Sequence, residues 1–164
     1  MEDSGYIGDP RRVRVLPGVP EALNALREAG FARIVVTNQS GVARGYFAKP
    51  DVELVHRALS EALAEAGAAV DAYYYCTHLE ACACRKPLPG MVRRAVAERD
   101  LDLACSVVFG DRAGDIGLAA GLGLPGILVG NTGTYDGPPP LYHARTLLEG
   151  VEFFLQSVAE RVDA

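Results

Sequence analysis

Helical patterns and short apolar runs alternate along this 164-residue chain, and this alternation constrains its fold more than any other feature. Apolar residues recur at helical spacing in 20–29, 50–66, 89–99, 114–122 and 149–162. Short runs that end in polar or glycine-rich turns lie at 31–37, 70–76, 106–109 and 126–129. Strict alternation of strands and helices is typical of an α/β fold with a doubly wound parallel sheet and helices on both faces. Residues 130–140, rich in Gly and Pro, are predicted to form a long surface loop.

Length and charge limit the classes of protein that fit this chain. Its length fits a single domain over 1–164. No apolar stretch approaches the roughly 18 to 20 residues that span a bilayer, and the start of the chain lacks the features of a secretory signal. The net charge of −5 disfavours nucleic acid as a general partner. We therefore expect a cytoplasmic, monomeric protein with reduced thiols and no membrane partner.

Three polar segments follow predicted strands directly. They are Thr37-Asn38-Gln39-Ser40, Cys76-Thr77-His78 and Gly110-Asp111-Arg112. Ligands of parallel α/β sheets bind outside the carboxyl ends of the strands. The functional site is therefore predicted at this edge of the sheet.

A cluster of soft metal ligands forms the sharpest local signal. Cys76, His78, Cys82 and Cys84 fall within nine residues. Zinc prefers a tetrahedral shell of Cys and His, and four protein ligands leave no open position, so the predicted Zn²⁺ site is structural. The alternatives are unrelated thiols beside a loop histidine, a disulfide, which a reducing compartment disfavours, or a thiol redox pair at Cys82 and Cys84. Cys105 stands apart and is predicted to be a small buried apolar residue.

Two segments carry groups that suit an anion. The hydroxyl, amide and backbone donors after residue 37 can cradle phosphate oxygens, with Arg44 as a bidentate clamp, although a polar turn has the same composition. The chain has 14 Arg and only two Lys. Lys86, next to Arg85, therefore reads as a point charge aimed at an anion, and a solvated basic pair is the alternative.

The third polar segment places two carboxylates at helical spacing. Asp111 is predicted to ligate a hard cation such as Mg²⁺, and Asp115, one turn further on, to hold a lysine or the loop in place. The alternative is a glycine turn followed by acids that suit a helix N-terminus.

Together, the segments TNQSGVARGYF, CTHLEACACRKPLPGM and VVFGDRAGDI resemble the haloacid dehalogenase superfamily. More narrowly, they resemble its zinc-containing D-glycero-D-manno-heptose 1,7-bisphosphate phosphatases and the related histidinol-phosphate phosphatases, although the zinc loop here is shorter than is usual. The resemblance implies a fold without a large cap domain. It also implies a Mg²⁺-dependent phosphatase for a small phosphorylated sugar, most simply the heptose bisphosphate, with histidinol phosphate as the alternative. It implies that Thr37 binds the transferred phosphoryl group, that Lys86 balances its charge with Asp115 beside it, and that Asp111 ligates Mg²⁺. The implied substrate contacts are Asp3, Ser4, Gly5, Tyr6, Asn38, Gln39, Ser40, Arg44, Arg85 and Arg112.

One departure from the family pattern bears on activity. Family members begin with a strand that ends in Asp-x-Asp-Gly, whose first Asp is the nucleophile that forms an aspartyl-phosphate and whose second is the general acid and base. The chain contains no such motif, and neither Asp3 nor Asp9 stands in the right pair. We expect the chain as written to be inactive, with the first strand and its motif upstream of Met1. The alternative is a non-catalytic, zinc-stabilised binding module.

Overall fold

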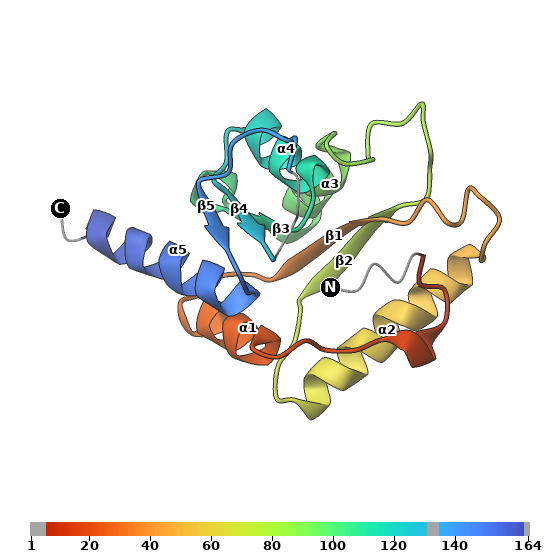
Figure 1. Cartoon of the computed structure of the whole chain (residues 1–164), viewed down its shortest axis with the longest axis horizontal. Helices are drawn as coiled ribbons and strands as arrows, with labels where there is room; N and C mark the ends of the chain where they lie inside the picture. The colour runs from red at the N-terminus through yellow and green to blue at the C-terminus, as the bar shows by residue number, and fades with distance from the viewer. Residues whose placement is uncertain (1–5, 131–134, 163–164) are drawn as a thin grey trace.

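The computed structural model describes residues 6–130 and 135–162 (Figure 1). The described elements are η1 (Pro10–Arg12), α1 (Val19–Glu28), β1 (Ile34–Asn38), α2 (Lys49–Glu65), β2 (Ala72–Cys76), α3 (Gly90–Arg99), η2 (Leu103–Cys105), β3 (Val108–Gly110), α4 (Ala113–Leu122), β4 (Gly126–Val129), β5 (Tyr142–Ala144) and α5 (Leu147–Val162). Each predicted helix and strand is present, with boundaries that differ by a few residues. β5 was not predicted, because three residues are too few to show an alternating pattern.

The ends of the helices follow from local chemistry. Pro20 lies in the first turn of α1, where its missing N–H removes no helical hydrogen bond. The chain leaves α1 and α2 through Gly30 and Gly67, whose φ angles of 84° and 72° lie in the left-handed region that glycine adopts without a steric cost.

All the described strand pairs are parallel, but they form two sheets. β1 pairs with β2, and β3, β4 and β5 form the second sheet in that order. The sequence predicted one continuous sheet, whereas β1 and β3 form no ladder with each other in the described part of the chain. Every described strand belongs to one of these two sheets, so the described residues contain no separate cap domain.

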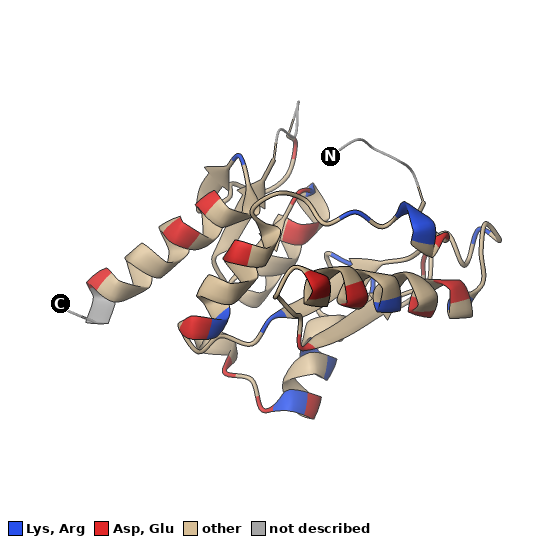
Figure 2. Ribbon diagram, turned by 90° about the horizontal axis from the view of Figure 1, so that it is seen from below, with Lys and Arg blue, Asp and Glu red and all other residues tan. Residues whose placement is uncertain are grey.

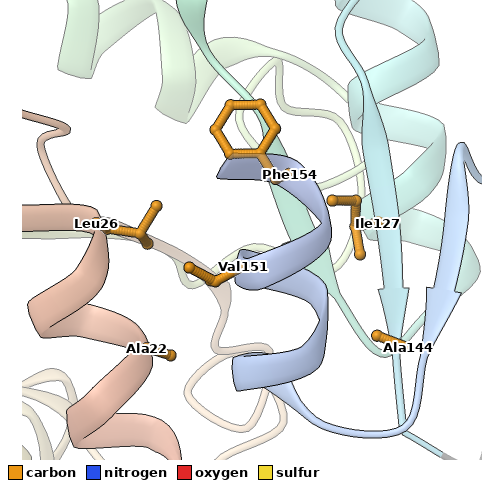
Figure 3. Close-up of a cluster of buried hydrophobic side chains, with 6 residues drawn as sticks. All are labelled: Ala22, Leu26, Ile127, Ala144, Val151 and Phe154. Atoms are coloured by element: carbon orange, nitrogen blue, oxygen red, sulfur yellow. The ribbon is translucent and has the colours of Figure 1, made fainter. Parts of the chain in front are cut away.

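Helices cover both faces of the larger sheet, as predicted. α5 packs on β4 and β5 from one side and also contacts α1. Figure 3 shows the side chains that meet there, which are Ala22, Leu26, Ile127, Ala144, Val151 and Phe154. On the opposite face α4 packs so closely that a Cβ on Gly126 would lie 3.0 Å from the side chain of Ala119.

The smaller sheet is also covered on both faces. On one side Met91 and Ala95 of α3 pack against Tyr74 and Cys76 of β2. On the other side the ring of His56 in α2 stacks on Tyr73, with 4.6 Å between the ring centroids.

The surface carries mixed charge. Acidic and basic residues are interspersed over the helices in Figure 2, consistent with a net charge of −5. No helix among the described residues is long and apolar enough to cross a membrane.

An ion pair joins the starts of β1 and β2, and its loss is expected to destabilise the protein. The guanidinium of Arg33, whose side chain is 10% exposed, donates two hydrogen bonds to the carboxylate of Asp71, at 3.0 and 2.8 Å. Asp71→Asn removes the charge that compensates this buried cation. Because Asp71 itself is about one-third exposed, solvent screens part of the effect, and we expect a loss of about 1–2 kcal/mol in urea unfolding at pH 7.

The pH dependence of this loss follows from the pKa of Asp71. The hydrogen bond from Arg33 lowers the pKa of this carboxyl, against the opposing effect of burial. The stabilisation is therefore present above the ordinary pKa of Asp and disappears as the pH falls through the lowered value, so wild type and variant should converge in acid. Asp9→Asn is the matched control, because the pair of Asp9 with Arg11 is exposed. Equal effects of the two substitutions would contradict the prediction.

Candidate active site and metal centre

Lys86 lies at the centre of the candidate site and links the two sheets. Its ammonium donates a 2.6 Å hydrogen bond to the carbonyl oxygen of Val36 in β1 and forms a 2.7 Å ion pair with Asp115 at the start of α4. The side chains of Lys86 and Asp115 are 14% and 9% exposed. The prediction that Asp115 holds a lysine is confirmed.

Asp115 also fixes the loop between β3 and α4. Its second carboxylate oxygen accepts a 3.1 Å hydrogen bond from the backbone N–H of Arg112. A Cβ on Gly110 would collide with the Asp115 side chain, so the strand must end in glycine for the carboxylate to lie there. Both roles suggested by the spacing, holding a lysine and holding the loop, are therefore present.

Asn38 fixes the backbone of Lys86. Its side-chain oxygen accepts a 2.9 Å hydrogen bond from the Lys86 N–H, and its amide nitrogen donates to the Lys86 carbonyl at 3.2 Å. Sequence reasoning placed Asn38 among the substrate contacts and missed this pairing, because 48 residues separate the two partners. Asn38 therefore acts on the site by positioning Lys86.

The other polar residues at the end of β1 and just after it lie close to Tyr6. Gln39 donates a 3.3 Å hydrogen bond to the hydroxyl of Thr37, and Ser40 is buried. A hydrogen bond with Ser40 lowers the pKa of the Tyr6 phenol. Burial opposes this shift, and the charges of Arg44 and Arg85 add to it. The structure thus brings Tyr6 and Arg44 together with the strand end, as predicted.

Two aromatic residues near this edge were not predicted. The ring of Tyr46 lies 5.0 Å from that of Tyr6, and it is 62% exposed. Tyr135 lies in the segment predicted only as a surface loop. A Cβ on Gly137 would collide with both Tyr135 and Ala113, so this tyrosine lies near the start of α4. Burial, followed by the charges of Asp136 and Asp115, raises its pKa. The available signal was an aromatic residue next to glycine in a segment without a helical or strand pattern.

The other predicted contacts lie around this centre. Asp111 directly follows β3, and Arg112 precedes the first residue of α4. Arg85 donates a 3.3 Å hydrogen bond to the carbonyl of His78, which directs it toward the cysteine cluster. Asp3, Ser4 and Gly5 lie outside the described residues. One Asp-x-Asp sequence does occur, at Asp100 and Asp102, but it precedes β3 and so lies toward the amino end of that strand.

The four predicted zinc ligands lie together. The ligand atoms of Cys76, His78, Cys82 and Cys84 are all within 4.8 Å of one another. Cys76 Sγ lies 3.6 Å from Cys82 Sγ and 3.0 Å from Cys84 Sγ, and His78 Nδ1 is 3.5 and 3.4 Å from Cys76 Sγ and Cys84 Sγ. A zinc tetrahedron with ordinary bond lengths has edges of about 3.8 Å between sulfurs and about 3.6 Å between sulfur and nitrogen. The donor set and the grouping of the four ligand atoms fit Zn²⁺, and the 3.0 Å between Cys76 Sγ and Cys84 Sγ is shorter than such an edge, so binding would move these two sulfurs apart.

Electrostatics favours a cation in this cluster. Burial, followed by the hydrogen bonds and charges of Cys76 and Cys82, raises the pKa of the Cys84 thiol to about 12. Adjacent thiolates repel one another, so a bound cation is what allows all three cysteines to ionise together. The prediction for Cys105 is wrong: this residue is exposed and lies in η2, because the strand begins three residues later at Val108.

The comparisons identify the class of protein that has this parallel α/β fold and these polar strand ends. Residues 83–147 match the haloacid dehalogenase family model described as HAD-hydrolase-like. The chain is 36% identical to a D-glycero-D-manno-heptose-1,7-bisphosphate 7-phosphatase of Thermosynechococcus vestitus, over 98% of this chain and 92% of the relative. It is 38% identical to a D-glycero-beta-D-manno-heptose-1,7-bisphosphate 7-phosphatase of Yersinia pestis, over 74% of this chain and 70% of the relative. Among solved structures, D,D-heptose 1,7-bisphosphate phosphatase from B. bronchiseptica, complexed with magnesium and phosphate, superimposes with a TM-score of 0.81 at 35% identity, covering 94% of this chain and 90% of that one.

The chain therefore belongs to the heptose-1,7-bisphosphate phosphatase family of haloacid dehalogenase-like hydrolases.

Proposed function

We propose that this protein, together with a nucleophile-bearing strand upstream of Met1, hydrolyses a phosphate ester of D-glycero-D-manno-heptose 1,7-bisphosphate. The observation that carries the proposal is the position of Lys86, a nearly buried ammonium held at the carboxyl end of the sheet by Val36 and Asp115. Among the described residues the ammonium of Lys86 forms an ion pair with one carboxylate, that of Asp115, and a second anion such as a phosphoryl group can bind beside it. The relatives that share this fold are phosphatases for that sugar bisphosphate.

The described residues divide the work of binding the phosphoryl group. The hydroxyl of Thr37 donates to a phosphoryl oxygen, and the Lys86 ammonium neutralises charge as it builds up on the oxygens in the transition state. Asp115 keeps Lys86 protonated and aimed at this position, and Asn38 fixes its backbone. Gln39, Ser40, Tyr6 and the arginines Arg44, Arg85 and Arg112 contact the rest of the substrate.

Magnesium is part of the proposed chemistry, but the described residues do not form a complete site for it. Asp111 supplies one carboxylate at the sheet edge, while Asp115 is already paired with Lys86. The Cys and His cluster is the one group of three or more potential metal ligands within the described residues. Magnesium favours octahedral oxygen coordination, so Asp111 would share the ion with carboxylates of the upstream segment. We therefore expect weak Mg²⁺ binding by the 164-residue chain.

The upstream segment and the zinc cluster have separate roles in the proposed phosphatase. The upstream segment carries the nucleophilic Asp and the general acid and base, so the chain as written is inactive. Zinc at the four-ligand cluster has no open position and stabilises the loop that carries Arg85 and Lys86. The protein acts as a single-domain, cytoplasmic monomer.

The substrate assignment is tested by comparing two phosphate esters. The form extended at its N-terminus should hydrolyse heptose bisphosphate with at least about tenfold higher kcat/KM than histidinol phosphate, because a second phosphate is attracted by Arg44 and Arg85 whereas the ammonium group of histidinol phosphate is repelled. The rate of phosphate release is measured for each of the two substrates, with and without Mg²⁺. Arg85→Met should reduce this preference, and Arg57→Met on the exposed face of α2 should not. Faster hydrolysis of histidinol phosphate would overturn the assignment.

A further inference from the structure

A cavity of about 560 Å³ lies where the segment before η1, the loop after β1 and the start of α2 meet. η1 packs against α2 beside it (Figure 1). Three aromatic side chains, two carboxylates, an arginine and a glycine line the cavity, namely Tyr6, Tyr46, Phe47, Asp9, Asp51, Arg12 and Gly8. Of these residues, only Tyr6 has a place in the proposed phosphatase site.

The loop after β1 fixes the position of Tyr46 in this lining. Gly45 has a φ of 73°, and the N–H of Tyr46 donates a 2.9 Å hydrogen bond back to the carbonyl of Gly41, so the loop turns back on itself. The next residue, Phe47, is anchored, because a Cβ on Gly41 would collide with its ring. Tyr46 itself is exposed, and its ring lies beside that of Tyr6. An exposed ring on an anchored backbone is available to a ligand without a large ordering cost.

Tyr6 connects the cavity to the polar groups at the end of β1. Its hydroxyl makes a hydrogen bond with Ser40, and the guanidinium carbon of Arg44 lies 6.0 Å from the centre of its ring. The same ring lines the cavity together with Tyr46. The cavity and these polar groups are therefore separated by no more than the length of one tyrosine side chain. A ligand with a phosphate beside Ser40 and Arg44 can extend into the cavity.

The lining suits the carbon skeleton of a sugar better than a second phosphate. Aromatic faces bury C–H groups, and carboxylates accept hydrogen bonds from hydroxyls. Asp51 accepts a 2.7 Å hydrogen bond from the N–H of Ala48, and a carboxylate offers about four acceptor positions, so hydroxyls can bind to it as well. The acids Asp9 and Asp51 outnumber the one lining cation, Arg12, which disfavours a phosphate here and leaves the phosphates on the side of Arg44.

We propose that Tyr46, together with Tyr6, binds the hydroxylated carbon skeleton of the sugar bisphosphate, and that Asp51 accepts hydrogen bonds from its hydroxyls. This role rests on the proposed function, which supplies the class of substrate, and it makes Tyr46 a residue that selects a sugar over other bisphosphates. The skeleton lies away from the reacting phosphorus, so its contacts are the same in the ground state and the transition state. Tyr46 therefore sets the affinity for the sugar and not the rate of the chemical step.

Calorimetry on the 164-residue protein tests this role without turnover. The two probes are heptose bisphosphate and heptane-1,7-diol bisphosphate, which carries the same two phosphates on a seven-carbon chain without a ring or further hydroxyls. Wild type should bind the sugar more tightly than the diol. Tyr46→Ala should weaken binding of the sugar about tenfold and change binding of the diol little, whereas Tyr46→Phe keeps the ring and should bind like wild type.

Two further variants serve as control and reporter. Leu141→Ala should change the binding of neither probe, because Leu141 is 53% exposed and lies beside the first residue of β4, at the amino edge of the sheet. The chain contains no tryptophan, so Tyr46→Trp places the only indole in the cavity lining. Its fluorescence emission should shift when heptose bisphosphate is added and stay unchanged with inorganic phosphate.

Kinetics of the form extended at its N-terminus separate affinity from rate. Tyr46→Ala should raise KM for heptose bisphosphate about tenfold and leave kcat within about twofold of wild type. The proposed role is overturned if kcat falls while KM stays unchanged, if wild type binds the sugar no more tightly than the diol, or if binding of the sugar does not depend on Tyr46. Binding of the sugar that depends on Tyr46, without hydrolysis by the extended form, would count against the proposed function alone.

Discussion

Removal of zinc is expected to lower the melting temperature of this protein by more than about 10 °C, and Cys84→Ser is expected to do nearly the same. The cluster joins the last residue of β2 to a loop of more than ten residues that contains no helix or strand before α3. Cys76 is 1% exposed, so the ligand site forms part of the packing between β2 and α3. Without the metal, buried thiols replace metal ligands, and the part of the loop before Arg85 loses the centre that joins its cysteines to β2.

Metal analysis and thermal unfolding check this expectation. The purified protein should contain one zinc per chain, and a strong chelator should lower the melting temperature of wild type more than that of Cys84→Ser. Cys105→Ser is the matched control, because Cys105 is exposed and outside the cluster. Protein without zinc, or Cys84→Ser with an unchanged melting temperature, would refute a structural zinc site.

The zinc loop also determines where Lys86 lies. Only Arg85 separates Cys84 from Lys86, so a metal-held Cys84 restricts the path of the backbone into the candidate site. Asn38 then fixes the Lys86 backbone from the side of β1. The zinc-bound Cys84 and the side-chain amide of Asn38 together fix the backbone from which the flexible Lys86 side chain extends. A binding site for an anion needs its cation held in place in this way.

Much of this arrangement could be predicted from local sequence. The four zinc ligands lie within nine residues, so their spacing alone predicted that they lie close together. The spacing of Asp111 and Asp115 placed Asp115 in the first turn of a helix, where it pairs with Lys86. The polar segments were predicted to share one edge because parallel strands share a direction. Each of these inferences used contacts that are local or set by the fold class.

Contacts between distant residues could not be predicted in this way. The Asn38 and Lys86 pairing joins residues 48 positions apart, and composition does not reveal which strand edges face each other. The division into two sheets depends on the absence of a ladder between β1 and β3, whose own sequences are as apolar as those of paired strands. Cys105 was assigned by its residue type, but the short helix η2 turns it outward.

The contrast between the extended and the 164-residue forms should be the largest activity effect. In the proposed mechanism an Asp attacks phosphorus in line. Asp115 is engaged with Lys86, Asp111 is assigned to Mg²⁺, and Asp100 and Asp102 lie near the amino end of β3, so none of these four is the proposed nucleophile. A form extended upstream by roughly a dozen residues ending in Asp-x-Asp-Gly gains this nucleophile. Its rate with heptose bisphosphate and Mg²⁺ should exceed that of the short form by at least about four orders of magnitude.

Three substitutions in the extended form separate the nucleophile from the site that supports it. Replacing the first Asp of the added motif by Asn should reduce turnover to the level of the short form, because an amide does not form the acyl-phosphate. Lys86→Ala should lower kcat by at least about a hundredfold with zinc content unchanged, since it removes the cation that neutralises the phosphoryl oxygens. Lys49 is the only other lysine of the chain and lies exposed at the start of α2, so Lys49→Ala should leave the rate unaltered.

If the short and extended forms hydrolyse the substrate at comparable rates, the nucleophile lies within the 164 residues and its assignment is wrong. If the upstream codons encode no Asp pair, the zinc-stabilised fold is a binding module, and Lys86 then serves to hold an anion that it does not turn over.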